Sequence, residues 1–263
     1  MIRLASHLAG VTVRGTTGRT APGRALLAPT LLAALALGLV ASPAPTGAQV
    51  QRRQIGSAPQ KPTAPSGVTV ARLRYGGGGD WYSNPSSLPN LMRTLAERTT
   101  VPVESFEEQR VSLLDDELYD YPFIYMNGHG NVQFTAEEVE RLREYLTAGG
   151  FLFADDNYGM DRSFRREMRR VFPEQQLVEV PFDHPIYHSY YEIPAGPPKV
   201  HEHDGKRPQG LGIFQDGRLV VYYTYESDVG DGIEDPDVHH DPPDIREAAM
   251  RMAINVVVYA LTS

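Results

Sequence analysis

The segment from Tyr121 to Asp156 constrains the fold more than any other part of the chain. A short apolar run, residues 123–126, leads into the sequence NGHG; a helix-forming stretch follows, and a second apolar run ends at Asp155 and Asp156. This pattern predicts a strand, a loop, a helix and a second strand. In open parallel sheets, ligands gather outside the carboxyl ends of the strands. We therefore expect a site near His129, Asp155 and Asp156.

The helix between the two apolar runs carries the clearest local signal in the chain. Thr135 and Glu138 have the spacing of a capping box, in which each side chain accepts a hydrogen bond from a free amide of the other residue. Gly149 is placed to end the helix in the left-handed conformation, which glycine adopts at little cost. The apolar positions between them form one stripe: Val139, Leu142, Tyr145 and Leu146.

Alternating strand and helix patterns extend over most of the remaining chain. Strands are predicted near residues 68–74, 101–106 and 177–180, helices near 88–95, 161–171 and 245–261, a helical turn at 113–118, a hairpin within 213–225 and an acidic loop at 228–244. Such alternation predicts an α/β fold with a mainly parallel sheet and helices on both of its faces.

The N-terminal segment differs in composition from the rest. Residues 1–24 contain four arginines and no acidic residue, residues 25–40 are apolar apart from Pro29 and Thr30, and residues 41–48 are small. This pattern predicts a signal peptide over residues 1–48, a flexible linker over 49–67 and a folded domain over 68–263, exported to the periplasm or secreted. The alternative is an uncleaved membrane anchor, because the apolar run approaches the ~17–20 residues that span a bilayer.

Charge and cysteine content exclude several functions. Removal of the leader would take the formal charge from −8 to −12. An acidic domain is poorly suited to nucleic acid, which is bound largely through Lys and Arg. The chain contains no cysteine. It therefore has no disulfide and no thiolate nucleophile, and it could bind a metal only through histidines and carboxylates.

Several separated motifs carry a family resemblance: YPFIYMNGHG, GGFLFADD, DHPIY and the closing INVVVYAL. Together they make residues 68–263 resemble the bacterial family called domain of unknown function 4159, which is grouped with class I glutamine amidotransferase-like proteins. The resemblance implies a flavodoxin-like three-layer α/β/α sandwich. It does not imply the activity, because those enzymes carry a cysteine where this chain has Asp155.

Asp155 and His129 are the candidate catalytic residues. A carboxylate at the end of a parallel strand can act as an acid, a base or a ligand, and a histidine between two glycines can approach a ligand closely. The alternative for Asp155 and Asp156 is a structural role in capping the next helix or its turn. For His129, the alternative is a turn that only requires glycine on either side.

A divalent metal is the candidate cofactor. His184 could complete a site with His129 and Asp155, because imidazole and carboxylate together suit zinc, iron or manganese. His201 and His203 are also spaced to lie on one face of an extended segment, although their polar neighbours favour a solvated loop.

A ligand-binding loop is predicted after the first strand. Asp80, Trp81 and Tyr82 follow four glycines, which favours a loop with an aromatic platform of the kind that stacks on a sugar; an ordinary surface loop is the alternative. Together with Gly128 and Gly130 beside His129, and with Asp156 and His184, these residues form the predicted binding site.

Three functions are compatible with these features. The leading hypothesis is a domain that binds a small polar, carbohydrate-like ligand or an envelope partner without glutamine amidotransferase activity. The second is a hydrolase, either metal-assisted or carboxylate-based, that uses Asp155 and His129. The third is a scaffold in a membrane-associated complex, which would fit an uncleaved anchor.

Overall fold

The computed structural model describes residues 67–263. The predicted signal peptide and all of the predicted linker except Gly67 lie outside the described residues. None of the helices within residues 67–263 is long and apolar enough to cross a membrane.

The domain is built on a seven-stranded mixed sheet with the order β2-β1-β3-β4-β7-β6-β5. The first five strands of that order run parallel, whereas β6 is antiparallel to both β7 and β5. The order of the parallel part is that of the flavodoxin-like doubly wound sheet. The strands are β1 (Ala71–Arg74), β2 (Gln109–Ser112), β3 (Phe123–Gly128), β4 (Phe151–Asp156), β5 (Val178–Glu179), β6 (Gln209–Gln215) and β7 (Arg218–Tyr225).

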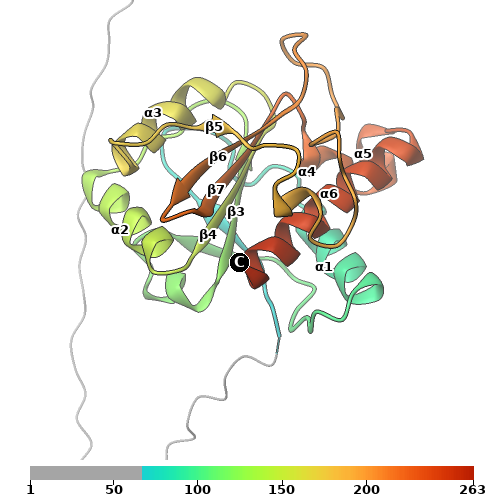
Figure 1. Cartoon of the computed structure of the whole chain (residues 1–263), viewed down its shortest axis with the longest axis horizontal. Helices are drawn as coiled ribbons and strands as arrows, with labels where there is room; N and C mark the ends of the chain where they lie inside the picture. The colour runs from blue at the N-terminus through green and yellow to red at the C-terminus, as the bar shows by residue number, and fades with distance from the viewer. Residues whose placement is uncertain (1–66) are drawn as a thin grey trace, which may run out of the picture. The chain divides into compact units, whose positions relative to one another are not determined.

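Helices cover both faces of the sheet (Figure 1). One face packs against α2 and α3 through a first apolar cluster, and the other packs against α1 and α6 through a second cluster. The helices are α1 (Ser87–Arg98), α2 (Ala136–Thr147), α3 (Asp161–Val171), α4 (Val229–Gly232), α5 (Pro236–His239) and α6 (Pro243–Thr262), with short 3₁₀ turns η1 (Asp116–Asp120) and η2 (Pro185–Tyr187).

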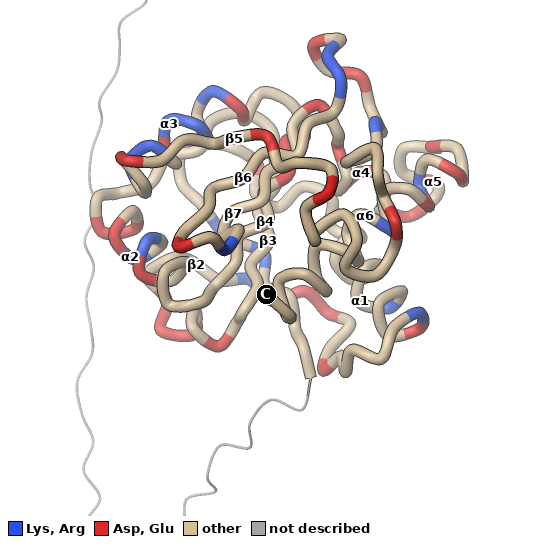
Figure 2. The backbone as a smooth tube through the Cα atoms, in the orientation of Figure 1, with Lys and Arg blue, Asp and Glu red and all other residues tan. Residues whose placement is uncertain are grey.

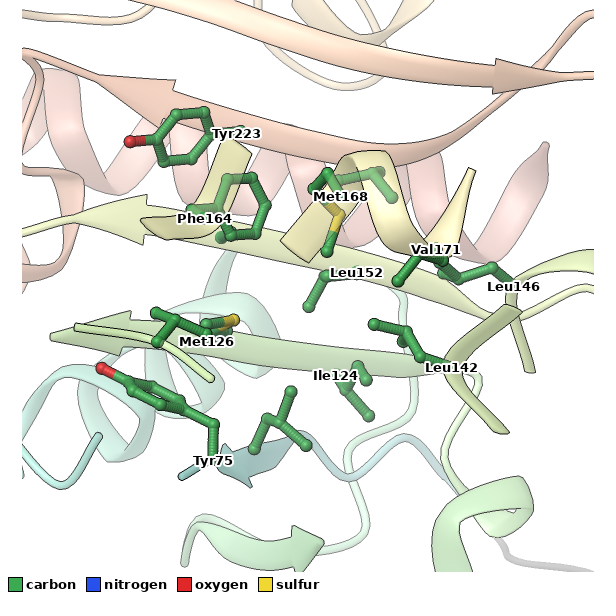
Figure 3. Packing of buried hydrophobic residues seen from close by; sticks show 14 of the residues in the cluster. Tyr75, Ile124, Met126, Leu142, Leu146, Leu152, Phe164, Met168, Val171 and Tyr223 are labelled. Atoms are coloured by element: carbon green, nitrogen blue, oxygen red, sulfur yellow. The ribbon is translucent and has the colours of Figure 1, made fainter. Parts of the chain in front are cut away.

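The predicted strand–loop–helix–strand unit between Tyr121 and Asp156 forms as β3, α2 and β4. Thr135 and Glu138 form the capping box at the start of α2, and Gly149 follows the helix with a φ of +113°. Strands β3 and β4 are buried along their whole length. Figure 3 shows Leu142 of α2 and Phe164 of α3 packed over these strands. The centroids of the Phe164 and Tyr223 rings are 4.4 Å apart.

The prediction of a strand at 101–106 is wrong. Within that stretch only Val103 forms a bridge, to Val68, and Phe106 is exposed. The edge strand is instead β2, whose sequence QRVS has one buried side chain, Val111. An edge strand with so little burial has almost no hydrophobic pattern, so alternation cannot locate it.

The acidic segment 228–244 is not a simple loop. It contains the two four-residue helices α4 and α5 and the start of α6. Figure 2 shows acidic residues along the segment that carries α5. Helices this short have no independent stability, so the segment depends on the contacts made by its side chains.

Candidate functional site

The carboxyl ends of β1, β3, β4 and β7 meet at one edge of the sheet. Asp155 lies in register with Asn127 of β3 on one side and with Thr224 of β7 on the other. The loops that follow these strands bring together the polar residues described below.

Asp155 is completely buried. Its carboxylate accepts hydrogen bonds from the Thr224 hydroxyl and from the backbone amides of Val229 (3.2 Å) and Gly230 (2.6 Å). Burial, together with the negative charge of Asp228, raises the pKa of Asp155 to about 7. The side chain therefore holds α4 against the sheet, and a ligand would reach it only if α4 moved.

Asp156 organises the loop that follows β4. Its Oδ1 accepts from the amides of Tyr158 and Met160, each at 3.0 Å, and its Oδ2 accepts from the Tyr223 hydroxyl at 3.1 Å. Burial raises the pKa of this carboxyl. Through these hydrogen bonds Asp156 fixes the backbone of the turn that leads into α3.

His129 and Asp80 form a pair at the surface. The Nδ1 of His129 lies 3.0 Å from Oδ2 of Asp80, and the His129 amide donates to the same carboxylate. Half of the His129 side chain is exposed. Gly128 has a φ of +139°, and a Cβ at this position would collide with the Tyr75 hydroxyl. The glycine is therefore required for this close approach.

Aromatic side chains lie in the loops beside this pair. Tyr82 is 61% exposed and Tyr158 is 53% exposed, whereas Trp81 is partly buried against the first apolar cluster with Arg110 over its ring. The loops adjoin one another, because the amide of Gly130 donates to the Tyr158 carbonyl oxygen at 3.4 Å. Trp81 is thus placed for packing, and the two tyrosines are the accessible aromatic residues.

A buried polar network supports the loops from below. Arg72 of β1 is fully buried; it donates to the Asn127 side chain and to the Asn84 carbonyl oxygen, and it forms an ion pair with Glu108 at 2.8 Å. Asn127 Nδ2 in turn donates to Asn157 Oδ1 at 3.1 Å. A network anchored on strands β1 and β3 and on the loops beside them holds the surface residues in place.

Histidines from the long irregular segment reach the same edge of the sheet. His201 Nδ1 lies 3.0 Å from Asp228 Oδ2, and His203 Nε2 lies 3.2 Å from the same oxygen. Hydrogen bonds that His201 donates to Asp228 and to Asp231 raise the pKa of His201 to about 11. Burial opposes ionisation of Asp228, but its bonds to the two histidines hold its pKa at about 2.

Asp231 is the second carboxylate of this group. Its Oδ2 lies 3.0 Å from His201 Nδ1 and 3.5 Å from His239 Nε2. His239 Nε2 is also 3.0 Å from Glu234, and His201 Nε2 is 3.1 Å from Asp241. Within the described residues, His201, Asp231 and His239 are therefore a group that could hold a metal ion.

The structure does not bring His184 to His129 and Asp155. His184 precedes η2, where its Nδ1 accepts from the Ile186 amide, and it lines a surface groove of about 940 Å³ with Arg218. Arg218 is the first residue of β7, so this groove lies at the opposite edge of the sheet. The predicted metal set of His129, Asp155 and His184 is not assembled.

Several residues of the strand-end site are not among the predicted site residues. They are Arg72, Asn84, Asn127, Asn157, Tyr158, Asp231, Glu234, His239 and Asp241. The signal that was available is the coincidence of HEHD at 201–204 with the acid- and histidine-rich DVGDGIEDPDVHHD at 228–241. Each stretch alone is typical of a solvated loop, and only their approach in space makes them a site.

The fold and this site define the class: an α/β domain with a doubly wound sheet and a polar site at the carboxyl ends of its strands. The chain belongs to the family designated domain of unknown function (DUF4159), whose model matches residues 69–261. No curated protein matches the chain.

Proposed function

We propose that this domain binds a small polyhydroxylated ligand, carbohydrate-like in chemistry, where the loops after β1 and β3 adjoin. The observation that carries this proposal is the position of the Asp80–His129 pair. Strand order reverses between β1 and β3, and Asp80 follows β1 while His129 follows β3. In doubly wound sheets the crevice at such a reversal is the usual ligand site.

The chemistry of the surface residues fits a sugar. The Asp80 carboxylate and the His129 imidazole can each bond a hydroxyl group, and both side chains are partly exposed. Tyr82 and Tyr158 add exposed aromatic rings on which the apolar face of a sugar ring can pack. The buried network under these loops keeps the site preorganised, which reduces the entropic cost of binding.

Glutamine amidotransferase activity of the thiolate type is not part of this proposal, because the chain has no cysteine. We also propose a distant relation to the class I glutamine amidotransferase-like proteins. It is supported by the flavodoxin-like order of the parallel strands and by the position of Asp155 at the end of β4.

Export is the remaining element of the proposal. The arginines, apolar run and small residues of residues 1–48 support a role in the periplasm or outside the cell, where carbohydrate-like ligands or an envelope protein would be met. N-terminal sequencing of the protein recovered from cells tests this directly. A mature terminus at Gln49 would support export, and an intact Met1 would contradict cleavage.

Backbone amide NMR spectra of the full chain, recorded with increasing glucose, maltose and N-acetylglucosamine, test the ligand proposal. We expect saturable shifts confined to residues 76–83, 128–131 and 157–159. Replacement of His129 or Tyr158 by alanine should abolish them, whereas Phe106→Ala, an exposed aromatic in another loop, should not. Absence of shifts with every sugar, or equal shifts in the His129→Ala protein, would overturn the proposal.

A hydrolase is the second candidate, and one observation favours it. Asp80 engages Nδ1 of His129, which leaves Nε2 as the nitrogen able to accept a proton from water or from a hydroxyl group. Turnover of chromogenic glycosides and esters, lost in His129→Gln, would support this function. Turnover that survives in both His129→Gln and Asp155→Asn would exclude these residues as its catalysts.

A further inference from the structure

His201, Asp231 and His239 come from separate segments, yet they direct ligand atoms toward a common point. Their three atoms lie within 4.8 Å of one another. Asp231 Oδ2 is 3.0 Å from His201 Nδ1 and 3.5 Å from His239 Nε2. Ligand atoms at 2.0–2.2 Å from a tetrahedral zinc ion are separated from each other by about 3.4 Å. The two separations that involve Asp231 Oδ2 are close to this value.

Ion pairing alone accounts poorly for this arrangement. His201 Nδ1 lies 3.0 Å from an oxygen of Asp228 and also 3.0 Å from an oxygen of Asp231. A single N–H group can point well at only one of these oxygens. A cation bound to a neutral imidazole nitrogen could attract both carboxylates at once.

The surroundings of these atoms resemble the outer shell of a metal site. His201 places its other nitrogen, Nε2, 3.1 Å from Asp241, which is the carboxylate–histidine arrangement that orients metal-binding imidazoles. Asp231 Oδ1 accepts from the Asn84 and Asn157 side-chain amides, so its Oδ2 remains directed toward the histidines.

Two buried atoms beside this group have no hydrogen-bond partner in the described chain. They are Oδ2 of Asp241 and Nδ1 of His203. Both side chains are about nine-tenths buried or more, with exposed fractions of 10% and 5%. Buried polar atoms are rarely left unpaired, and a bound ion or water is a common partner for those that lack one within the protein.

We propose that His201 Nδ1, Asp231 Oδ2 and His239 Nε2 bind a divalent first-row transition metal ion, zinc being the best match to two imidazoles and a carboxylate. Three protein ligands are the number found in zinc sites that keep a position for water or substrate. Two further carboxylates lie beside the ligand atoms: Glu234 is 3.0 Å from His239 Nε2, and Asp228 is 3.0 Å from His201 Nδ1. The proposal does not rest on sugar binding at Asp80 and His129.

The ion would also have a structural effect. His201 belongs to the irregular segment before β6, whereas Asp231 and His239 belong to α4 and α5. Two four-residue helices cannot sustain themselves, so an ion that joins them to the irregular segment would stabilise this part of the site.

Isothermal titration of Zn²⁺ into the untagged, chelator-treated full chain tests the proposal, with zinc content after dialysis measured by plasma mass spectrometry. We expect one tight equivalent. His239→Ala and the nearly isosteric Asp231→Asn should lose it, and Asp241→Asn should weaken it by about 10–100-fold, the usual effect of removing an outer-shell partner. His240→Ala is the matched control, because His240 is the neighbouring exposed histidine and lies outside the group.

Thermal denaturation of the same proteins separates metal binding from misfolding. Zinc should raise the melting temperature of the wild-type and His240→Ala proteins and leave that of a folded His239→Ala protein unchanged. The proposal is overturned if the wild type takes up no zinc, or if folded His239→Ala and Asp231→Asn bind zinc as tightly as the wild type. Loss of sugar shifts with zinc binding intact would overturn only the function proposed above.

Discussion

Replacement of Asp155 by asparagine should change how the stability of the domain depends on pH. In the folded protein, burial and the charge of Asp228 raise the pKa of Asp155 from 3.8 to about 7. Because the folded-state value is the higher one, the folded state holds the proton more tightly. The resulting stabilisation is complete below about pH 4 and is lost as the pH rises through about 7.

The size of the effect follows from the shift. A difference of about 3 pKa units, at 1.36 kcal/mol for each unit, corresponds to about 4 kcal/mol. Asparagine is neutral at every pH and keeps an oxygen that can accept from Thr224 and Val229. The substitution also destabilises the fold, because the new amide group faces the Gly230 N–H. This loss of stability does not vary with pH.

Urea unfolding at several pH values between about 4 and about 8, with a chelator present, measures this directly. The free energy of unfolding of Asp155→Asn, relative to the wild type, should rise by about 4 kcal/mol over that range. Asp216→Asn, at an exposed turn with a φ of +51° that asparagine tolerates, is the control for exchanging a carboxyl for an amide at the surface. Parallel curves for Asp155→Asn and the wild type would refute the reasoning.

Three further predictions test local features. Thr135→Ala removes the capping box of α2 and should cost about 0.5–2 kcal/mol in chemical denaturation; no loss would show that the box is dispensable. Burial lowers the pKa of His184, so the contribution of this residue to stability should fall as the pH drops below about 6.5. His184→Asn keeps an acceptor for the Ile186 amide and should remove that decline. An unchanged dependence of stability on pH in this variant would contradict the prediction. Gly230→Ala would place a Cβ 2.5 Å from the Tyr125 hydroxyl and should destabilise the domain by about 1–3 kcal/mol, which equal denaturation midpoints would disprove.

The parts of the fold that local chemistry determines could be predicted from the sequence. The capping box at Thr135 and Glu138, the glycine after α2 and the wholly apolar starts of β3 and β4 are signals contained within a few residues. The edge strand β2 could not be found, because burial of Val111 alone leaves no periodic pattern. What identifies that strand is its pairing with β1, which is a tertiary contact.

The placement of three candidate residues could be predicted, whereas most of the polar residues around them could not. His129, Asp155 and Asp156 do lie at the carboxyl ends of strands, since that placement follows from the strand boundaries. The fully buried Arg72 could not be recognised, because its burial depends on Glu108, which lies far from it in the chain.

The group of His201, Asp231 and His239 also depends on contacts between distant parts of the chain, which the sequence does not reveal. His201 and His239 are separated by more than thirty residues of sequence, yet their rings lie 5.1 Å apart. Neither stretch predicts the other, so the meeting of the two loops had to come from the structure. The proposed metal site is therefore an inference that the sequence alone does not support.

The zinc site proposed at His201, Asp231 and His239 can be located directly in a crystal. Anomalous diffraction at the zinc absorption edge, from crystals of the protein grown with one equivalent of zinc, tests it most directly. We expect a peak about 2.0–2.2 Å from His201 Nδ1, Asp231 Oδ2 and His239 Nε2. A well-occupied peak elsewhere on the chain, with none at these three residues, would contradict it.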